Sequence, residues 1–180
     1  YEIAQCLVGS EMCIRDRDVD YTVPDRIADG YGINENIINH AIEDGIDTIV
    51  TCDNGIAAIP QINYAKDNNM TVIVTDHHDI PFKEENGEKV FLESDADAIV
   101  NPKQKECKYP FKMLCGATVA YKIIEIIYER LNLNPEDLNE YRQLAAIATI
   151  GDVVDLEDEN RILVKFGLST LKNTKNTGIR

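Results

Sequence analysis

Two short β-branched, apolar runs, residues 48–52 and 71–75, do most to limit how this chain can fold. Runs of this length and composition are typical of strands buried in a parallel sheet. A helical pattern opens at Ile56 between them, so the expected order is strand, helix, strand. Such a crossover brings the carboxyl ends of both strands to the same edge of the sheet. We therefore predict an α/β fold with a parallel sheet flanked by helices.

Polar side chains follow both predicted strands. Residues 53–55 read Asp-Asn-Gly after the first strand, and residues 76–78 read Asp-His-His after the second. If the strands are neighbours, their ends lie about 5 Å apart, at the edge where open α/β sheets bind ligands. Carboxylate oxygens beside imidazole nitrogens favour a metal site. Two other interpretations remain open, since Asp53 can cap a helix and the Asp-His-His triplet can be an ordinary polar loop.

A third acidic segment lies far downstream. The apolar stretch over residues 144–150 ends in Gly151 and Asp152, and two β-branched residues follow. Asp152 therefore lies at a sharp change of pattern. From the residues alone, we interpret Asp152 as a capping carboxylate for the next helix, which we predict over residues 161–171.

Two local signals predict further elements. Residues 83–93 are polar and contain Asn86-Gly87, so we expect a hairpin or a loop insertion after the triplet. Asn134 and Pro135 have the order of an N-cap followed by proline in the first turn of a helix.

Taken in order, the acidic segments resemble the motifs of the DHH phosphoesterase superfamily, which is named for the triplet. Within it, they resemble the RecJ family of single-stranded-DNA-specific 5′→3′ exonucleases. Segments at residues 21–34, 96–103 and 109–117 are also similar to that family. The triplet alone is a weak signal, whereas the ordered set across residues 18–180 is specific. The resemblance implies a DHH phosphoesterase-like domain.

The resemblance also implies a role for each matched residue. Asp53, His77 and Asp152 match metal ligands, and Asp76 and His78 match catalytic positions that orient ligands or meet the scissile phosphate. The implied cofactor is a pair of Mn²⁺ or Mg²⁺ ions, which activate water and stabilise the attacking and leaving oxygens. The implied reaction is hydrolysis of single-stranded DNA in repair and recombination, with other repair proteins as further partners.

One motif of the family has no match. Asp18 and Asp20 have the spacing of the family's first, Asp-x-Asp motif but lack its preceding strand and following glycine, so we do not interpret them as ligands. Residues 1–17 resemble a translated sequencing adapter, and we interpret them as non-native. We expect residues 18–180 to form a partial DHH domain without the first motif and the C-terminal domains. We accordingly expect this polypeptide to be nearly inactive by itself.

Composition limits the class of protein further. An apolar content of 44% is enough for one cored domain, and the chain holds no apolar run long enough to span a membrane. Outside residues 1–17, the cysteines are odd in number and form no CxxC pair: Cys52, Cys107 and Cys115. This pattern favours reduced thiols over disulfides or a zinc site. We expect a cytoplasmic monomer in which Cys52 is a small core residue.

The charge argues against a free-standing DNA-binding domain, because the net charge is −14. A local basic cluster lies near Tyr109 and Phe111 and consists of Lys103, Lys105, Lys108 and Lys112. This basic cluster can guide a single strand by phosphate contact and stacking. A solvated loop with an aromatic anchor explains the same residues.

Two other functions remain open. The first is another DHH phosphoesterase activity: oligoribonuclease, cyclic-dinucleotide phosphodiesterase or manganese pyrophosphatase. Residues 53–55 and 109–111 favour the RecJ type over these. The second is a non-catalytic scaffold, which the presence of Asp53, His77 and Asp152 disfavours.

Overall fold

The computed structural model describes residues 19–24, 32–174 and 176–179. The interpretation of residues 1–17 and of Asp18 lies outside these residues. The chain forms two compact units, one over Thr22–Lys108 and one that includes Tyr109–Arg180. None of the helices in the described residues has the length and apolarity needed to cross a membrane.

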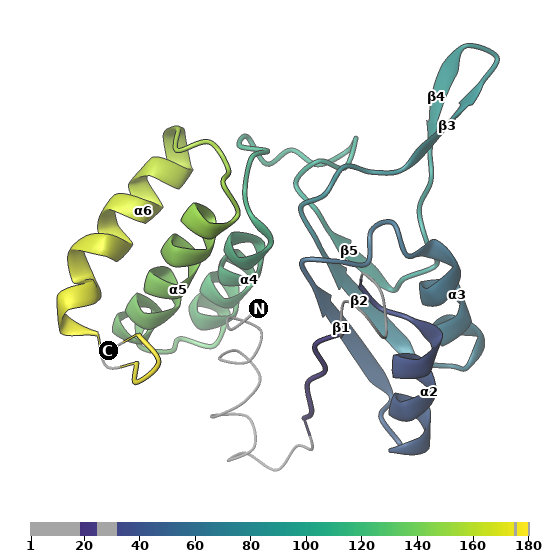
Figure 1. The fold of residues 1–180 in the computed structure, drawn as a ribbon, viewed down its shortest axis with the longest axis horizontal. Helices are drawn as coiled ribbons and strands as arrows, with labels where there is room; N and C mark the ends of the chain where they lie inside the picture. The colour runs from purple at the N-terminus through teal and green to yellow at the C-terminus, as the bar shows by residue number, and fades with distance from the viewer. Residues whose placement is uncertain (1–18, 25–31, 175, 180) are drawn as a thin grey trace. The chain divides into compact units, whose positions relative to one another are not determined.

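The first unit is built on a parallel three-stranded sheet (Figure 1). Its strands are β1 (Thr48–Cys52), β2 (Thr71–Thr75) and β5 (Ala98–Val100), in the order β1-β2-β5. Two helices accompany them, α2 (Glu35–Glu43) and α3 (Ile59–Asp67). The predicted α/β fold is confirmed, and the first two strands have the predicted bounds.

The core of this unit lies between the central strand and the helices. Val72 and Val74 of β2 are fully buried, and they pack in one cluster with Ile38 of α2 and Ile62 of α3. Burying a side chain of this size contributes about 1.5–3 kcal/mol. This packing fixes the sheet with β1 and β2 in register, so that their last residues lie side by side.

A β-hairpin projects from this unit (Figure 1). It consists of β3 (Phe82–Glu85) and β4 (Glu88–Phe91). Asn86 and Gly87 form the two-residue turn with φ of 55° and 83°, the left-handed conformation that the tightest hairpin turns require. Of the two possibilities for residues 83–93, the hairpin is therefore confirmed.

The second unit is helical. It contains α4 (Gly116–Arg130), α5 (Leu138–Gly151) and α6 (Asp158–Thr170), with short 3₁₀ helices η2 (Pro135–Asp137) and η3 (Leu171–Asn173). As predicted, Asn134 caps the turn that begins at Pro135, by accepting a hydrogen bond from Glu136 N. The start predicted for the last helix at residue 161 is wrong. The helix begins earlier, at Asp158, where two acidic residues suit the positive end of the helix dipole.

Close packing of α5 on α6 depends on Gly167. A Cβ at this position would collide with the Ala146 side chain and lie 3.1 Å from the Arg142 carbonyl oxygen. We expect Gly167→Ala to lower the free energy of unfolding by about 1–3 kcal/mol, measured by urea denaturation. The matched control is Gly151→Ala, since a Cβ there meets nothing within 4 Å. Equal effects of the two substitutions would contradict this account.

Candidate metal centre

The turn after β1 presents Asp53 to solvent. Asp53 has a φ of 63°, and its side chain is 45% exposed. Gly55 completes the turn with a φ of 107°, and a Cβ there would lie 2.7 Å from Thr51 Oγ1. The same hydroxyl donates a hydrogen bond to the Asn54 carbonyl oxygen at 2.8 Å. The Asp-Asn-Gly sequence therefore holds a carboxylate at the end of the strand.

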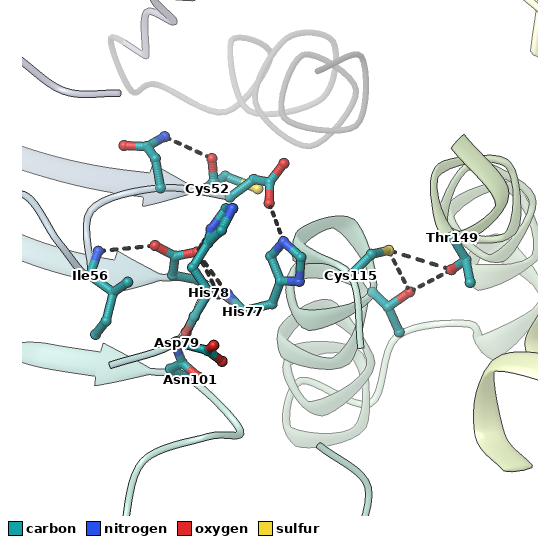
Figure 2. Close-up of polar contacts among 12 residues, drawn as sticks. Cys52, Ile56, His77, His78, Asp79, Asn101, Cys115 and Thr149 are labelled. Carbon is teal, nitrogen blue, oxygen red and sulfur yellow. Dashed lines mark hydrogen bonds and ion pairs between the residues drawn. The ribbon is translucent and has the colours of Figure 1, made fainter. Parts of the chain in front are cut away.

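The Asp-His-His loop after β2 is organised by Asp76, which is 1% exposed. Its Oδ1 accepts hydrogen bonds from the backbone N–H groups of His77 and His78, at 2.7 and 3.2 Å. Its Oδ2 accepts from Ile56 N at 3.0 Å, which ties this loop to the loop after β1 (Figure 2). Both carboxylate oxygens are therefore used inside the protein.

Asp76 also orients the His78 ring. His78 Nδ1 lies 2.6 Å from Asp76 Oδ1 (Figure 2). A proton on Nδ1, facing the carboxylate, leaves the Nε2 lone pair for a ligand. The His78 side chain is 60% exposed, so this nitrogen is presented at the surface of the site.

Asp53, His77 and His78 form a cluster whose candidate ligand atoms all lie within 4.8 Å of one another. His77 Nε2 is 3.0 Å from Asp53 Oδ1, and the two histidine rings have centroids 4.4 Å apart. One carboxylate and two imidazoles suit a divalent transition ion, and the carboxylate also suits Mg²⁺. The interpretation of the triplet as an ordinary polar loop does not explain this convergence.

The structure contradicts the helix-capping interpretations of Asp53 and Asp152. Asp53 does not cap α3, whose N-cap is Ala58, because a turn with Ile56 and Ala57 at its centre separates the aspartate from the helix. Asp152 does not cap α6, whose N-cap is Glu157. It is instead the exposed C-cap residue of α5 in the second unit, and its role as a metal ligand stays a prediction. Asp20 is exposed, and its carboxylate accepts a hydrogen bond from the neighbouring Tyr21 N.

The predicted basic cluster divides between the two units. Lys103 forms an ion pair with Asp79 at 2.8 Å, and Lys105 and Lys108 are exposed. Lys112 belongs to the second unit. A contact of these lysines with DNA stays a prediction.

Tyr109, the aromatic residue beside these lysines, has a structural role. Its hydroxyl donates a hydrogen bond to Glu159 Oε2 of α6 at 2.6 Å. Partial burial, followed by that hydrogen bond, raises the pKa of Tyr109 above its usual value. This geometry favours the aromatic anchor that the sequence left open as an alternative.

Cys52 is a poor candidate for a ligand or nucleophile, although Asp53 follows it directly. Burial, and next the charge of Asp53, raise the pKa of the Cys52 thiol to about 11. The thiol is therefore neutral near pH 7, and neutral thiols neither bind metals well nor attack readily. This agrees with the expected role as a small packed residue.

The sequence analysis missed Asn101, which supports the Asp-His-His loop by a hydrogen bond to the His78 backbone. Asn101 is 2% exposed and follows β5 directly. Its Nδ2 donates to the His78 carbonyl oxygen at 2.9 Å, and its Oδ1 accepts from Lys103 N at 2.8 Å. The signals in the sequence are an amide side chain at the end of a third apolar run and its place in the family-like segment 96–103.

We expect Asn101→Ala to lower the free energy of unfolding by about 1–3 kcal/mol, because the partly buried His78 carbonyl and Lys103 N–H lose their partner. We also expect it to weaken Mn²⁺ binding about 10-fold or more, since His78 loses support. Calorimetry and urea denaturation measure the two effects. Asn68→Ala is the matched control, because Asn68 makes a similar bond to Tyr64 O at an exposed position. An unchanged Mn²⁺ affinity in Asn101→Ala would show that the residue does not support the site.

A parallel sheet with acidic and imidazole side chains at its carboxyl edge defines the class of this protein. The chain belongs to the DHH family, because residues 2–150 match the model of the DHH family, N-terminal domain. It is similar to the single-stranded-DNA-specific exonuclease RecJ of Bacillus subtilis, with 41% identity over 90% of this chain and 19% of that protein. The corresponding Escherichia coli protein is 34% identical over 88% of this chain and 27% of its own length.

Solved structures agree with this assignment. A crystal structure of exonuclease RecJ bound to manganese matches with a TM-score of 0.73 and 33% identity, over 88% of this chain and 37% of that one. A Mn²⁺ complex of RecJ from Thermus thermophilus matches with a TM-score of 0.61 and 32% identity, over 79% of this chain and 20% of that one. The chain thus spans less than a third of the length of the curated relatives named above.

Proposed function

We propose that this chain is part of a metal-dependent 5′→3′ exonuclease that hydrolyses single-stranded DNA. The observation that carries the proposal is the convergence of Asp53, His77 and His78 within 4.8 Å. The similarity to exonucleases named for single-stranded DNA supports the choice of substrate. The manganese in two related structures supports Mn²⁺ as the cofactor, with Mg²⁺ as the other candidate.

In this proposal, Asp53 and His77 hold the ion, and Asp152 is a further ligand. Bound Mn²⁺ or Mg²⁺, two ions in the complete enzyme, supplies Lewis acidity and lowers the pKa of bound water. Asp76 keeps the His78 ring fixed, with its Nδ1 proton facing the carboxylate. His78 then presents its Nε2 lone pair beside Asp53 and His77. A hydrogen bond from Nε2 to the scissile phosphate, which the resemblance implies, would require the doubly protonated ring.

The negative charge of the chain makes DNA binding depend on cations. The net charge is −14, and carboxylates repel phosphate groups unless a cation neutralises them. DNA binding by the chain is therefore expected to require the divalent ion.

The experiment compares substrates with the protein in excess, because the sequence predicts low activity. A 5′-labelled single-stranded DNA, its duplex, an oligoribonucleotide, a cyclic dinucleotide and pyrophosphate are each incubated with Mn²⁺ or with chelator. We expect mononucleotide release from the single strand to be fastest, to require Mn²⁺ and to be absent in His77→Ala. Faster hydrolysis of pyrophosphate or a cyclic dinucleotide would replace the proposal with another phosphoesterase activity. Mn²⁺ binding without hydrolysis of any substrate would favour a non-catalytic scaffold.

A further inference from the structure

The β3–β4 hairpin is an arm that takes no part in the core of its unit. All eight strand residues are exposed, and the hairpin extends away from the parallel sheet (Figure 1). Isolated two-stranded hairpins are marginally stable in water, and a further strand or packed surface stabilises them. The arm therefore has the form of an element that another chain can complete.

One face of the arm carries exposed aromatic side chains. Phe82 and Phe91 lie opposite each other in the register and pack edge-to-face, with ring centroids 6.2 Å apart. They are 43% and 46% exposed. Lys89 lies over the Phe82 ring, with Nζ 4.1 Å from its centroid. Two exposed aromatic rings on a projecting strand pair are typical of a recognition surface.

The backbone edges of the arm are also available. Leu92 N donates to the Pro81 carbonyl oxygen at 2.8 Å, which makes this pair a hydrogen-bonded one. Since bonded and non-bonded pairs alternate, the pair of Phe82 with Phe91 is non-bonded. Its backbone donors and acceptors consequently face outward, where an extended peptide can add as a strand.

The acidic side chains around the arm favour a basic peptide as its partner. Residues 79–95 contain six carboxylates and two lysines, and Glu84, Glu85 and Glu88 surround the tip. Such a surface repels both a phosphate backbone and a second copy of the same arm. It attracts a peptide that carries lysine or arginine.

We propose that the β3–β4 arm is a docking site for an extended basic segment of a partner protein. The aromatic face receives the apolar side chains of that segment, and the glutamates at the tip pair with its cations. The strand edges supply main-chain hydrogen bonds. The proposal does not depend on the proposed function, since the arm contains no residue of the metal cluster.

The test measures binding of a short fluorescent peptide of alternating lysine and valine by anisotropy, at low ionic strength. An arm variant carries Glu84→Lys, Glu85→Lys and Glu88→Lys, and a second variant carries Phe82→Ser and Phe91→Ser. We expect each variant to weaken peptide binding about tenfold or more. We expect both variants to keep the unfolding midpoint and the Mn²⁺ affinity of the wild type, because all strand residues of the arm are exposed.

A matched control separates the arm from the general acidity of the chain. It reverses three exposed carboxylates on helices, through Glu43→Lys, Asp67→Lys and Glu129→Lys, and we expect it to weaken binding less than about threefold. Equal weakening by the control and arm variants would overturn the proposal. So would unchanged peptide binding in the Phe82→Ser, Phe91→Ser variant. Tighter, phenylalanine-dependent binding of oligothymidylate would instead identify the arm as a nucleic-acid contact.

Discussion

Replacing Asp53 with alanine is expected to remove Mn²⁺ binding while the protein stays folded. Asp53 supplies the only carboxylate of the cluster that also contains His77 and His78. Its side chain is 45% exposed, so its removal leaves no cavity, but it takes away the partner of the buried His77 Nε2. We expect the Mn²⁺ dissociation constant measured by calorimetry to rise about 100-fold or more. The free energy of unfolding without metal should fall by no more than about 1–2 kcal/mol, because His77 Nε2 loses its partner and alanine replaces aspartate at a positive φ.

The control for Asp53→Ala is Asp79→Ala in the nearby loop. The Asp79 side chain is 91% exposed and pairs with Lys103, and it is not a member of the cluster. We expect this variant to bind Mn²⁺ like the wild type. If both variants lose Mn²⁺ equally, the metal binds through general acidity, and the assigned cluster is wrong.

Replacing Asp76 with alanine is expected to act first on stability. The Asp76 carboxylate accepts hydrogen bonds from three backbone N–H groups, those of Ile56, His77 and His78. Alanine leaves these groups without their acceptor in a site where Asp76 is 1% exposed. We expect the free energy of unfolding to fall by about 3–5 kcal/mol, measured by urea denaturation with circular dichroism.

A milder substitution tests the reason for that loss. Asp76→Asn keeps one carbonyl acceptor and nearly the same volume, so we expect a smaller loss of about 1–3 kcal/mol. Mn²⁺ affinity in this variant should still fall, because His78 Nδ1 loses the carboxylate 2.6 Å away. A loss of less than about 1 kcal/mol in Asp76→Ala would mean that water replaces the carboxylate and that Asp76 does not organise the loop.

The Asp53 and Asp76 variants together separate two roles that the triplet and its neighbouring loop combine. Asp53→Ala is expected to change metal affinity with only a small loss of stability. Asp76→Ala is expected to change both, because the same carboxylate holds the two loops together. The resemblance to the DHH superfamily grouped Asp76 with the catalytic positions, and its burial supports the orienting role over direct contact with phosphate.

The sequence by itself determined the elements that depend on local pattern. The β-branched runs predicted β1 and β2 with their bounds, because such residues favour extended backbone and the Asp-Asn-Gly and Asp-His-His segments end it. Asn86-Gly87 predicted the hairpin, since few other pairs adopt a left-handed turn without strain. The same local reasoning failed for the helix caps. A carboxylate near a helix can equally end the preceding element, as Asp152 ends α5.

Tertiary structure alone decided which side chains support the site. Asp76 bonds to Ile56 across 20 residues of sequence, and Asn101 bonds to His78 across 23. Gly167 is required because α5 approaches α6 closely at that point. None of these contacts follows from a residue's own segment, because each depends on how separate strands and helices pack. The sequence therefore predicted that Asp53, His77 and His78 follow two neighbouring strands at one edge of the sheet, and packing determined what holds them in place.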